Sequence, residues 1–108
     1  MILPAFAARL DVYLHRLRAG IAAMAASLGG LDALVFTGGV GENATAVRGG
    51  ACAGLGFLGV EIDHDANATA RGDALIGALS SPASVLVIAA REDLEIARQA
   101  RAFLRARA

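Results

Sequence analysis

The stretch DALVFTGGVGENATAVRGG, residues 32–50, decides the fold class and contains the strongest candidate for a functional site. Its apolar run stops at Thr37, and three glycines and the acid–amide pair Glu42-Asn43 follow. A run this short between glycines predicts a strand rather than a helix. Because the apolarity is continuous rather than alternating, we expect a strand covered on both faces. The polar pair therefore stands where a buried strand ends.

Helices are predicted on both sides of this strand. Apolar residues recur at spacings of three, four and seven over residues 5–28, which is typical of an amphipathic helix, and Gly29-Gly30 would end it. Residues 45–58 can form a second helix, capped by Asn43 or Thr45. Several glycines lower its helix propensity, so close packing against a neighbour would have to hold it. These glycines are Gly49, Gly50, Gly54 and Gly56.

The second half of the chain is less regular. Residues 59–63 suggest a short strand, residues 64–73 a loop, and the segment ALIGAL is ambiguous. SVLVIAA, residues 84–90, is rich in β-branched residues and predicts a clear strand. A final helix is expected over residues 92–106. The order helix–strand–helix–weak strands–strand–helix indicates an α/β layered fold.

Composition limits the protein class. With 108 residues we expect a single domain, 1–108, and one cysteine permits no internal disulfide, so a cytoplasmic location is expected. The 56% hydrophobic content and mean hydropathy of +0.57 favour extensive burial or a membrane protein. Glycines interrupt the most apolar stretch, residues 19–41, which argues against a spanning helix. The formal net charge of zero argues against nucleic acid as a partner.

The glycine-rich loop has two possible explanations. Ligands bind at the carboxyl ends of strands in open α/β sheets, and glycines let the backbone approach a ligand closely. A helix starting near residues 43–45 would favour an anion or a nucleotide, which Glu42 and Asn43 could contact at the ribose or base. A tight glycine turn with a capping residue explains the same pattern equally well. The loop matches neither Walker A nor G-x-G-x-x-G.

A second candidate lies where the later strand meets the last helix, in IAAREDLEIAR, residues 88–98. Acids in a first helical turn complement the helix dipole, which is a sufficient structural reason for Glu92, Asp93 and Glu95. The functional alternative has one carboxylate turned toward the sheet edge to hold magnesium.

Other chemically interesting residues favour structural explanations. Cys52 is expected to be a small buried residue rather than a reactive thiol. His15 and His64 are far apart in sequence, and the acids around His64, residues 63–65, favour a solvated loop over a metal site. Arg48 follows the glycine loop by one helical turn. It is expected on the helix surface, with an approach to phosphate as the alternative.

Taken together, the two loops resemble one known family. FTGGVGEN is similar to the FT-[A/G]-G-[I/V]-GEN motif of the acetate and propionate kinases, and Tyr13 and Arg16 suit the lead-in to it. VLVIAAREDLEIAR resembles the family's VLVI-x-TNEEL-x-IAR ending, and Asn67 suits its asparagine between the two. The segment RGGACAGLGFLGVEID matches at Arg48, Cys52, Leu55, Leu58, Gly59 and Asp63.

The resemblance implies the C-terminal part of a sugar-kinase and actin-like (ASKHA, ribonuclease H-like) α/β domain. It implies ATP or ADP and Mg²⁺ as cofactors and transfer of the ATP γ-phosphoryl group to a short-chain carboxylate such as acetate. It also implies that Glu92 contacts magnesium. The residues implied to line the adenosine side of the ATP pocket are Gly39, Val40, Gly41, Glu42 and Asn43.

Departures from the family pattern limit what the resemblance implies. Arg91, Asp93 and Ala90 replace the usual Asn, Glu and Thr, and family members are several times longer. No catalytic or substrate-binding residue can be assigned, so we expect no turnover by this chain alone. Its expected partners are the missing N-terminal half or a second copy in a homodimer. The alternative hypothesis is a non-catalytic dimerisation or scaffold remnant of the family.

Overall fold

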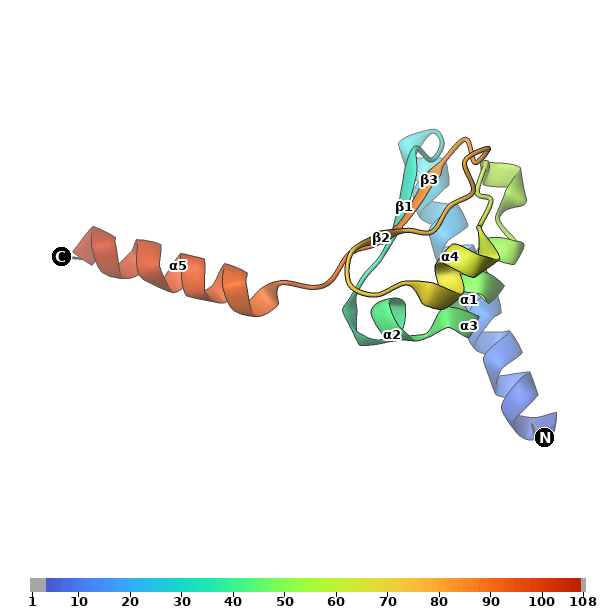
Figure 1. The fold of residues 1–108 in the computed structure, drawn as a ribbon, viewed down its shortest axis with the longest axis horizontal. Coiled ribbons are helices and arrows are strands. Elements are labelled where there is room, and N and C mark those ends of the chain that lie inside the picture. The colour runs from blue at the N-terminus through green and yellow to red at the C-terminus, as the bar shows by residue number, and fades with distance from the viewer. Residues whose placement is uncertain (1–3, 108) are drawn as a thin grey trace.

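The computed structural model describes residues 4–107 and shows an α/β domain in which helices pack around a three-stranded mixed sheet (Figure 1). Among these residues, no helix is both long enough and apolar enough to cross a bilayer. The elements are α1 (Pro4–Leu28), β1 (Ala33–Phe36), α2 (Gly38–Asn43), α3 (Thr45–Ala53), the 3₁₀ turn η1 (Gly56–Leu58), α4 (His64–Thr69), β2 (Ala74–Leu75), β3 (Ser84–Val87) and α5 (Glu92–Arg107).

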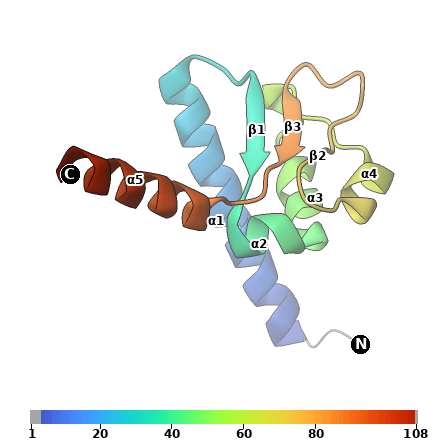
Figure 2. The ribbon, with the colours of Figure 1, turned by 60° about the vertical axis from the view of Figure 1, so that its left-hand side comes forward.

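The sheet has the order β1-β3-β2. β1 is parallel to β3, with Ala33 opposite Ser84 and Phe36 opposite Val87, whereas β2 is antiparallel to β3. The carboxyl ends of β1 and β3 therefore lie at the same sheet edge, where α2 and the segment leading to α5 meet (Figure 2). Both loops that the sequence singled out emerge from this edge.

The hydrophobic core lies between the sheet and the helices α1 and α3. α3 buries Ala51 and Cys52, and α1 contributes Leu14 and Ala25. Partly buried residues of α1, among them Leu17 and Ile21, pack against this core. Its central members are Phe36, Ala51, Cys52, Leu55, Val60, Ile76, Ala83, Val85 and Val87.

The two long helices are confirmed. α1 ends at Leu28, and Gly29 and Gly30 follow with φ of +79° and +144°, conformations that favour glycine. α5 occupies the range expected for the final helix. The expected second helix is shorter than predicted: α3 stops at Ala53 and the chain continues as the 3₁₀ turn η1.

Two predicted loops are short helices instead. Residues 64–69 form α4, because the Asp63 carboxylate accepts hydrogen bonds from the backbone N–H groups of Asp65 (3.0 Å) and Ala66 (3.1 Å) and so caps the helix. The glycine-rich loop forms the helix α2, and Ala44, with φ −101° and ψ 83°, separates it from α3. The helix start expected at residues 43–45 is confirmed by α3, which begins at Thr45. The separate helix α2 before it was not expected.

The expectation that β1 is covered on both faces is wrong for this chain. β1 is an edge strand, and the side chain of Val35 is 48% exposed. Only Phe36 of the four residues is buried. The continuous apolar run therefore leaves part of its surface uncovered.

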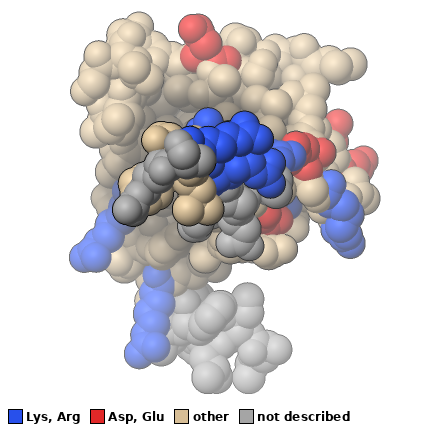
Figure 3. All heavy atoms as spheres, turned by 90° about the vertical axis from the view of Figure 1, so that its left-hand side faces the viewer, with Lys and Arg blue, Asp and Glu red and all other residues tan. Residues whose placement is uncertain are grey.

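α5 projects away from the rest of the molecule (Figure 1), so its apolar residues Phe103 and Leu104 are 60% and 66% exposed. The Cα radius of gyration is 17.0 Å, compared with about 13 Å for a compact domain of this length. Seen toward the end of α5, basic side chains gather over this helix (Figure 3). The helix thus has both a basic surface and an apolar one outside the core.

Gly50 and Gly20 should respond oppositely to alanine. A Cβ at Gly50 would lie 2.6 Å from Leu14 Cδ1, whereas a Cβ at Gly20 meets no atom within 4 Å. We expect Gly50→Ala to lower the free energy of unfolding by about 1–3 kcal/mol through overpacking against buried Leu14. Gly20→Ala should raise it by about 0.5–1 kcal/mol. Urea denaturation checks both, and equal stabilisation by both would show that Leu14 moves aside freely.

Cys52 should be chemically silent in the folded chain. Burial raises the pKa of its thiol to about 11, with the nearby Arg48 charge acting in the opposite direction. At pH 8 the thiol is therefore protonated and inaccessible. We expect no reaction with a disulfide reagent until denaturant unfolds the chain; rapid reaction of the native protein would contradict this burial.

Candidate functional site

The short helix α2 (Gly38–Asn43), called the α2 turn below, is open on one side and closely packed on the other. A Cβ at Gly39 would meet no atom within 4 Å, and neither would one at Gly38, whose φ is +78°. A Cβ at Gly41 would instead lie 3.2 Å from the backbone carbon of Phe36. Gly39 therefore leaves bare backbone facing solvent, whereas Gly41 is needed so that the turn can lie against the end of β1.

Hydrogen bonds from three residues hold the α2 turn. The side-chain amide of Asn43 donates to the Gly39 carbonyl (2.9 Å), and the Ala44 N–H donates to the Val40 carbonyl (2.9 Å). Arg48 Nη1 donates to the carbonyls of Gly41 (3.0 Å) and Glu42 (2.9 Å). The last carbonyls of a helix lack partners within it, so Arg48 caps α2 from within α3.

The expected place of Arg48 on the helix surface is wrong, because its side chain is 1% exposed. Burial lowers the pKa of its guanidinium. Its remaining N–H groups donate to Asn67 Oδ1 (2.7 Å), the Asn67 carbonyl (2.9 Å) and Thr45 Oγ1 (3.3 Å). All five donors of the guanidinium are thus used within the chain, so the alternative of an approach to phosphate would require breaking one of these bonds.

Glu42 connects the two sequence motifs. One of its carboxylate oxygens accepts a hydrogen bond from the Ala90 backbone N–H (3.1 Å), across 48 positions of sequence. The Ile88 N–H also donates to the Phe36 carbonyl (2.9 Å), which extends the β1–β3 pairing. In this structure the Glu42 carboxylate therefore holds the chain segment before α5, in addition to any ligand contact.

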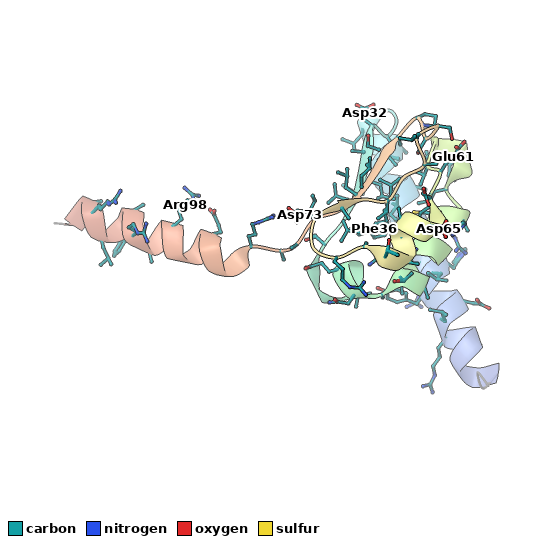
Figure 4. The ribbon with its side chains drawn as sticks, viewed as in Figure 1. Asp32, Phe36, Glu61, Asp65, Asp73 and Arg98 are labelled. Carbon is teal, nitrogen blue, oxygen red and sulfur yellow. The ribbon has the colours of Figure 1, made fainter. Side chains whose placement is uncertain are left out.

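Asp73 holds the same segment from the other side. Its carboxylate accepts from the Ala89 N–H (2.8 Å) and pairs with the Arg91 guanidinium. Figure 4 shows Asp73 beside the point where the chain leaves the domain toward α5. The hydrogen bond from Ala89 and that from Arg91 lower the pKa of Asp73. Arg91, which replaces the asparagine usual in the family motif, thus has Asp73 as its acidic partner.

Four of the five predicted nucleotide residues border one of two cavities. Val40 and Gly41 line an apolar cavity of about 300 Å³ between α1 and β1, together with Tyr13. Glu42 and Asn43 line a polar one of about 200 Å³, whose other members are Thr45, Arg48, Ala70, Arg71 and Gly72. Gly39 borders neither and stays open. The α2 turn thus separates an apolar hollow from a polar one.

The described part of the chain contains no cluster of potential metal ligands. Glu92 begins α5, but its side chain, like that of Asp93, lies outside the described residues. Within that part, no three His, Cys, Asp or Glu residues come together as a metal site. Asp63 is a helix cap, which agrees with the structural interpretation of the acids near His64, although the segment is helical rather than a loop.

The sequence pattern of the acetokinase family matches residues 5–98. The chain belongs to the acetokinase family. Among curated relatives, it is 62% identical over 90 residues to the acetate kinase of Gloeobacter violaceus and 51% identical over 90 residues to that of Rippkaea orientalis. Each match covers 83% of this chain and 22% of the relative, so the chain spans about a fifth of the length of these enzymes.

Solved acetokinase structures have the same local fold. The acetate kinase of Porphyromonas gingivalis superposes with a TM-score of 0.80 at 35% identity, covering 88% of this chain and 24% of that one. The acetate kinase of Entamoeba histolytica gives 0.78 at 32% identity, covering 85% and 24%. A propionate kinase from Francisella tularensis gives 0.69 at 36% identity, covering 79% and 21%. The resemblance seen in the motifs is confirmed.

Sequence reasoning missed the two residues that hold this site together. Arg48 matched the family pattern and was expected on the helix surface, with an approach to phosphate as the alternative, but its burial was not expected; Asp73 was not singled out. The signals available for Arg48 were its place one turn after the glycines and its match to the family pattern; nothing in the sequence marked Asp73 as the partner of residues 89–91.

The bonds of Asp73 should be lost on acidification. Because its pKa is lowered in the folded chain, the carboxylate accepts from Ala89 above the ordinary Asp pKa of about 3.9 and releases this N–H as the pH falls through the lower folded value. We expect the Ala89 amide resonance to titrate with a midpoint below about 3.9. Asp73→Asn is the control; a titration that persists in it would assign the effect to another group.

Proposed function

We propose that this chain is the C-terminal part of an acetate kinase-like phosphotransferase and supplies the adenosine side of its ATP pocket. The observation that carries the proposal is the bare backbone of Gly39 at the common carboxyl edge of β1 and β3. In α/β sheets this edge is where ligands bind. Membership of the acetokinase family makes a nucleotide the best-supported ligand.

The α2 turn offers suitable chemistry for a nucleoside. A Cβ at Gly39 would meet no atom within 4 Å, and Val40 next to it is 52% exposed, so a flat apolar group can lie against this surface. Asn43 and Glu42 border the polar hollow, where a ribose could find acceptors and donors. The proposed cofactor-binding residues thus remain Gly39, Val40, Gly41, Glu42 and Asn43, within a larger ASKHA-type domain.

The described residues do not form a complete magnesium site. Glu92 is proposed as a magnesium-linked acid only by its match to the family motif. The nearby Asp73 carboxylate is already bound to the Ala89 N–H and to Arg91. Divalent magnesium needs several oxygen ligands in octahedral geometry, so the described residues near α5 do not fit it by themselves.

The phosphoryl-transfer chemistry is assigned to the portion of the enzyme that this chain does not cover. The reaction would move the ATP γ-phosphoryl group to a carboxylate such as acetate, giving an acyl phosphate and ADP. Such catalysis depends on positioning and charge neutralisation. We propose that this chain orients the nucleoside, and we expect a phosphotransfer assay with acetate and ATP to show no turnover by the chain alone.

ADP binding gives a direct test with a matched pair of variants. At a free concentration 100 times Kd, ligand stabilises the folded state by about 2.7 kcal/mol, which raises Tm by roughly 10–20 °C for a domain of this size. Gly39→Val should keep the Tm of the free chain but lose this rise, because its side chain covers the open backbone. Gly41→Val should lower the Tm of the free chain itself, because it strains contact with Phe36.

The contrary outcomes are distinct. If saturating ADP leaves the Tm of the unmodified chain unchanged, the nucleotide proposal fails for this chain. If Gly39→Val binds ADP as tightly as the unmodified chain, the ligand does not lie against α2.

An apolar surface supports the alternative, a non-catalytic dimerisation or scaffold role. A groove of about 430 Å³ between α1 and the start of β1 includes Met24 and Leu28, which are 65% and 73% exposed. It shares Leu17, Ile21 and Leu34 with the apolar cavity beside α2. Sedimentation equilibrium tests this role: a concentration-dependent dimer that Met24→Glu disrupts, with no ADP response, would favour it.

A further inference from the structure

α3 carries a buried positive charge, Arg48, that has no acidic partner among the described residues. Arg48 is 1% exposed, and each of its described hydrogen bonds goes to an uncharged oxygen. Burying a charged group is costly unless it is both paired with an opposite charge and hydrogen-bonded. A charged residue in such surroundings, beside the proposed nucleotide site, needs an explanation beyond packing.

The five hydrogen bonds of Arg48 join three separate elements. Two bonds go to the carbonyls of Gly41 and Glu42 at the end of α2, and one goes to Thr45 at the start of α3. The other two go to Asn67 in α4. Asn67 is itself 3% exposed, and its amide donates to the Thr45 carbonyl (3.1 Å). The network is closed, since each of its polar side chains is satisfied.

We infer that Arg48 is a positioning residue for the nucleotide site: with Asn67 it fixes the α2 turn, and hence the open backbone of Gly39, against α3 and α4. This inference rests on the proposed nucleotide function for its consequence in binding. The fixing of α2 itself is independent of any ligand.

The chemistry of arginine explains why this residue and not lysine occupies the position. A planar guanidinium presents five donors in a fixed fork, whereas an ammonium presents three. Arg48→Lys therefore cannot reach α2, Thr45 and Asn67 together. At least two of the acceptor oxygens would be left without a donor, so the α2 turn should loosen while the charge remains.

The test compares Arg48→Lys with Arg18→Met. Arg18 is the matched control because its Nη1 also donates to a backbone carbonyl of α3, that of Gly50 (2.9 Å), but makes no described bond to α2. Amide hydrogen exchange without nucleotide is the first readout. In Arg48→Lys we expect exchange at residues 40–45 to rise more than at β3, whereas Arg18→Met should not single out these residues. Uniform change, or none at residues 40–45, would overturn the inference.

ADP affinity by calorimetry is the second readout. Arg48→Lys should weaken binding about tenfold or more, as expected for loss of a charge-assisted hydrogen bond that holds the site, and Arg18→Met should not. If the unmodified chain does not bind ADP but Arg48→Lys still loosens only α2, the proposed function fails and the role of Arg48 in fixing α2 stands. If the α2 turn loosens and ADP affinity is unchanged, Arg48 does not position the site.

A measurement on the unmodified chain covers the case in which the variant does not fold. The Nε–H of Arg48 donates to Asn67 Oδ1 in a buried environment, whereas Arg71 is exposed. We expect the Nε–H resonance of Arg48 to exchange with water far more slowly than that of Arg71. Equal exchange rates would show that the buried network does not exist in solution and would overturn the inference.

Discussion

The candidate site depends on one buried guanidinium. A six-residue helix such as α2 is too short to be stable through its own hydrogen bonds. Its C-terminal carbonyls are satisfied by Arg48, which comes from the next helix and is held in turn by Asn67. The conformation of the glycine-rich turn is therefore a tertiary property: it needs α3 and α4 in place before it can exist.

This dependence explains which parts of the fold the sequence could predict. α1 follows from a regular apolar period and a double glycine, and β3 follows from a compact run of β-branched residues. Burial of Cys52 and the close approach of α1 to the glycines of α3 also follow from local composition, because small residues allow helices to touch. These features depend on nearest neighbours along the chain or on one helix face.

The rest depends on contacts between distant residues, which leave no local pattern. Gly38–Asn43 has poor helix propensity and becomes helical through Arg48 and the Asn43 side chain. The spacing of Arg48 in the sequence is that of a surface residue. Its partners on α2 and α4 allow the charge to be buried, and these partners are not apparent from the local sequence. Segment 89–91 is fixed by Glu42 and Asp73, across 48 and 16 positions of sequence. Family resemblance marked Arg48 and Asn67 as matching positions along with the α2 residues, but it did not show that these two hold α2 in place.

The same contacts change the interpretation of Glu42. Glu42 is not only a candidate ligand residue. Its carboxylate accepts a hydrogen bond from the Ala90 N–H, and its backbone carbonyl accepts one from Arg48. Glu42 thus lies between the buried network and the segment that leads into α5. Because α5 itself lies outside the core, its orientation relative to the sheet is set largely at Ala89–Arg91, by Glu42 on one side and Asp73 on the other. The direction of α5 therefore depends in part on the same Glu42 carboxylate that borders the proposed nucleotide site.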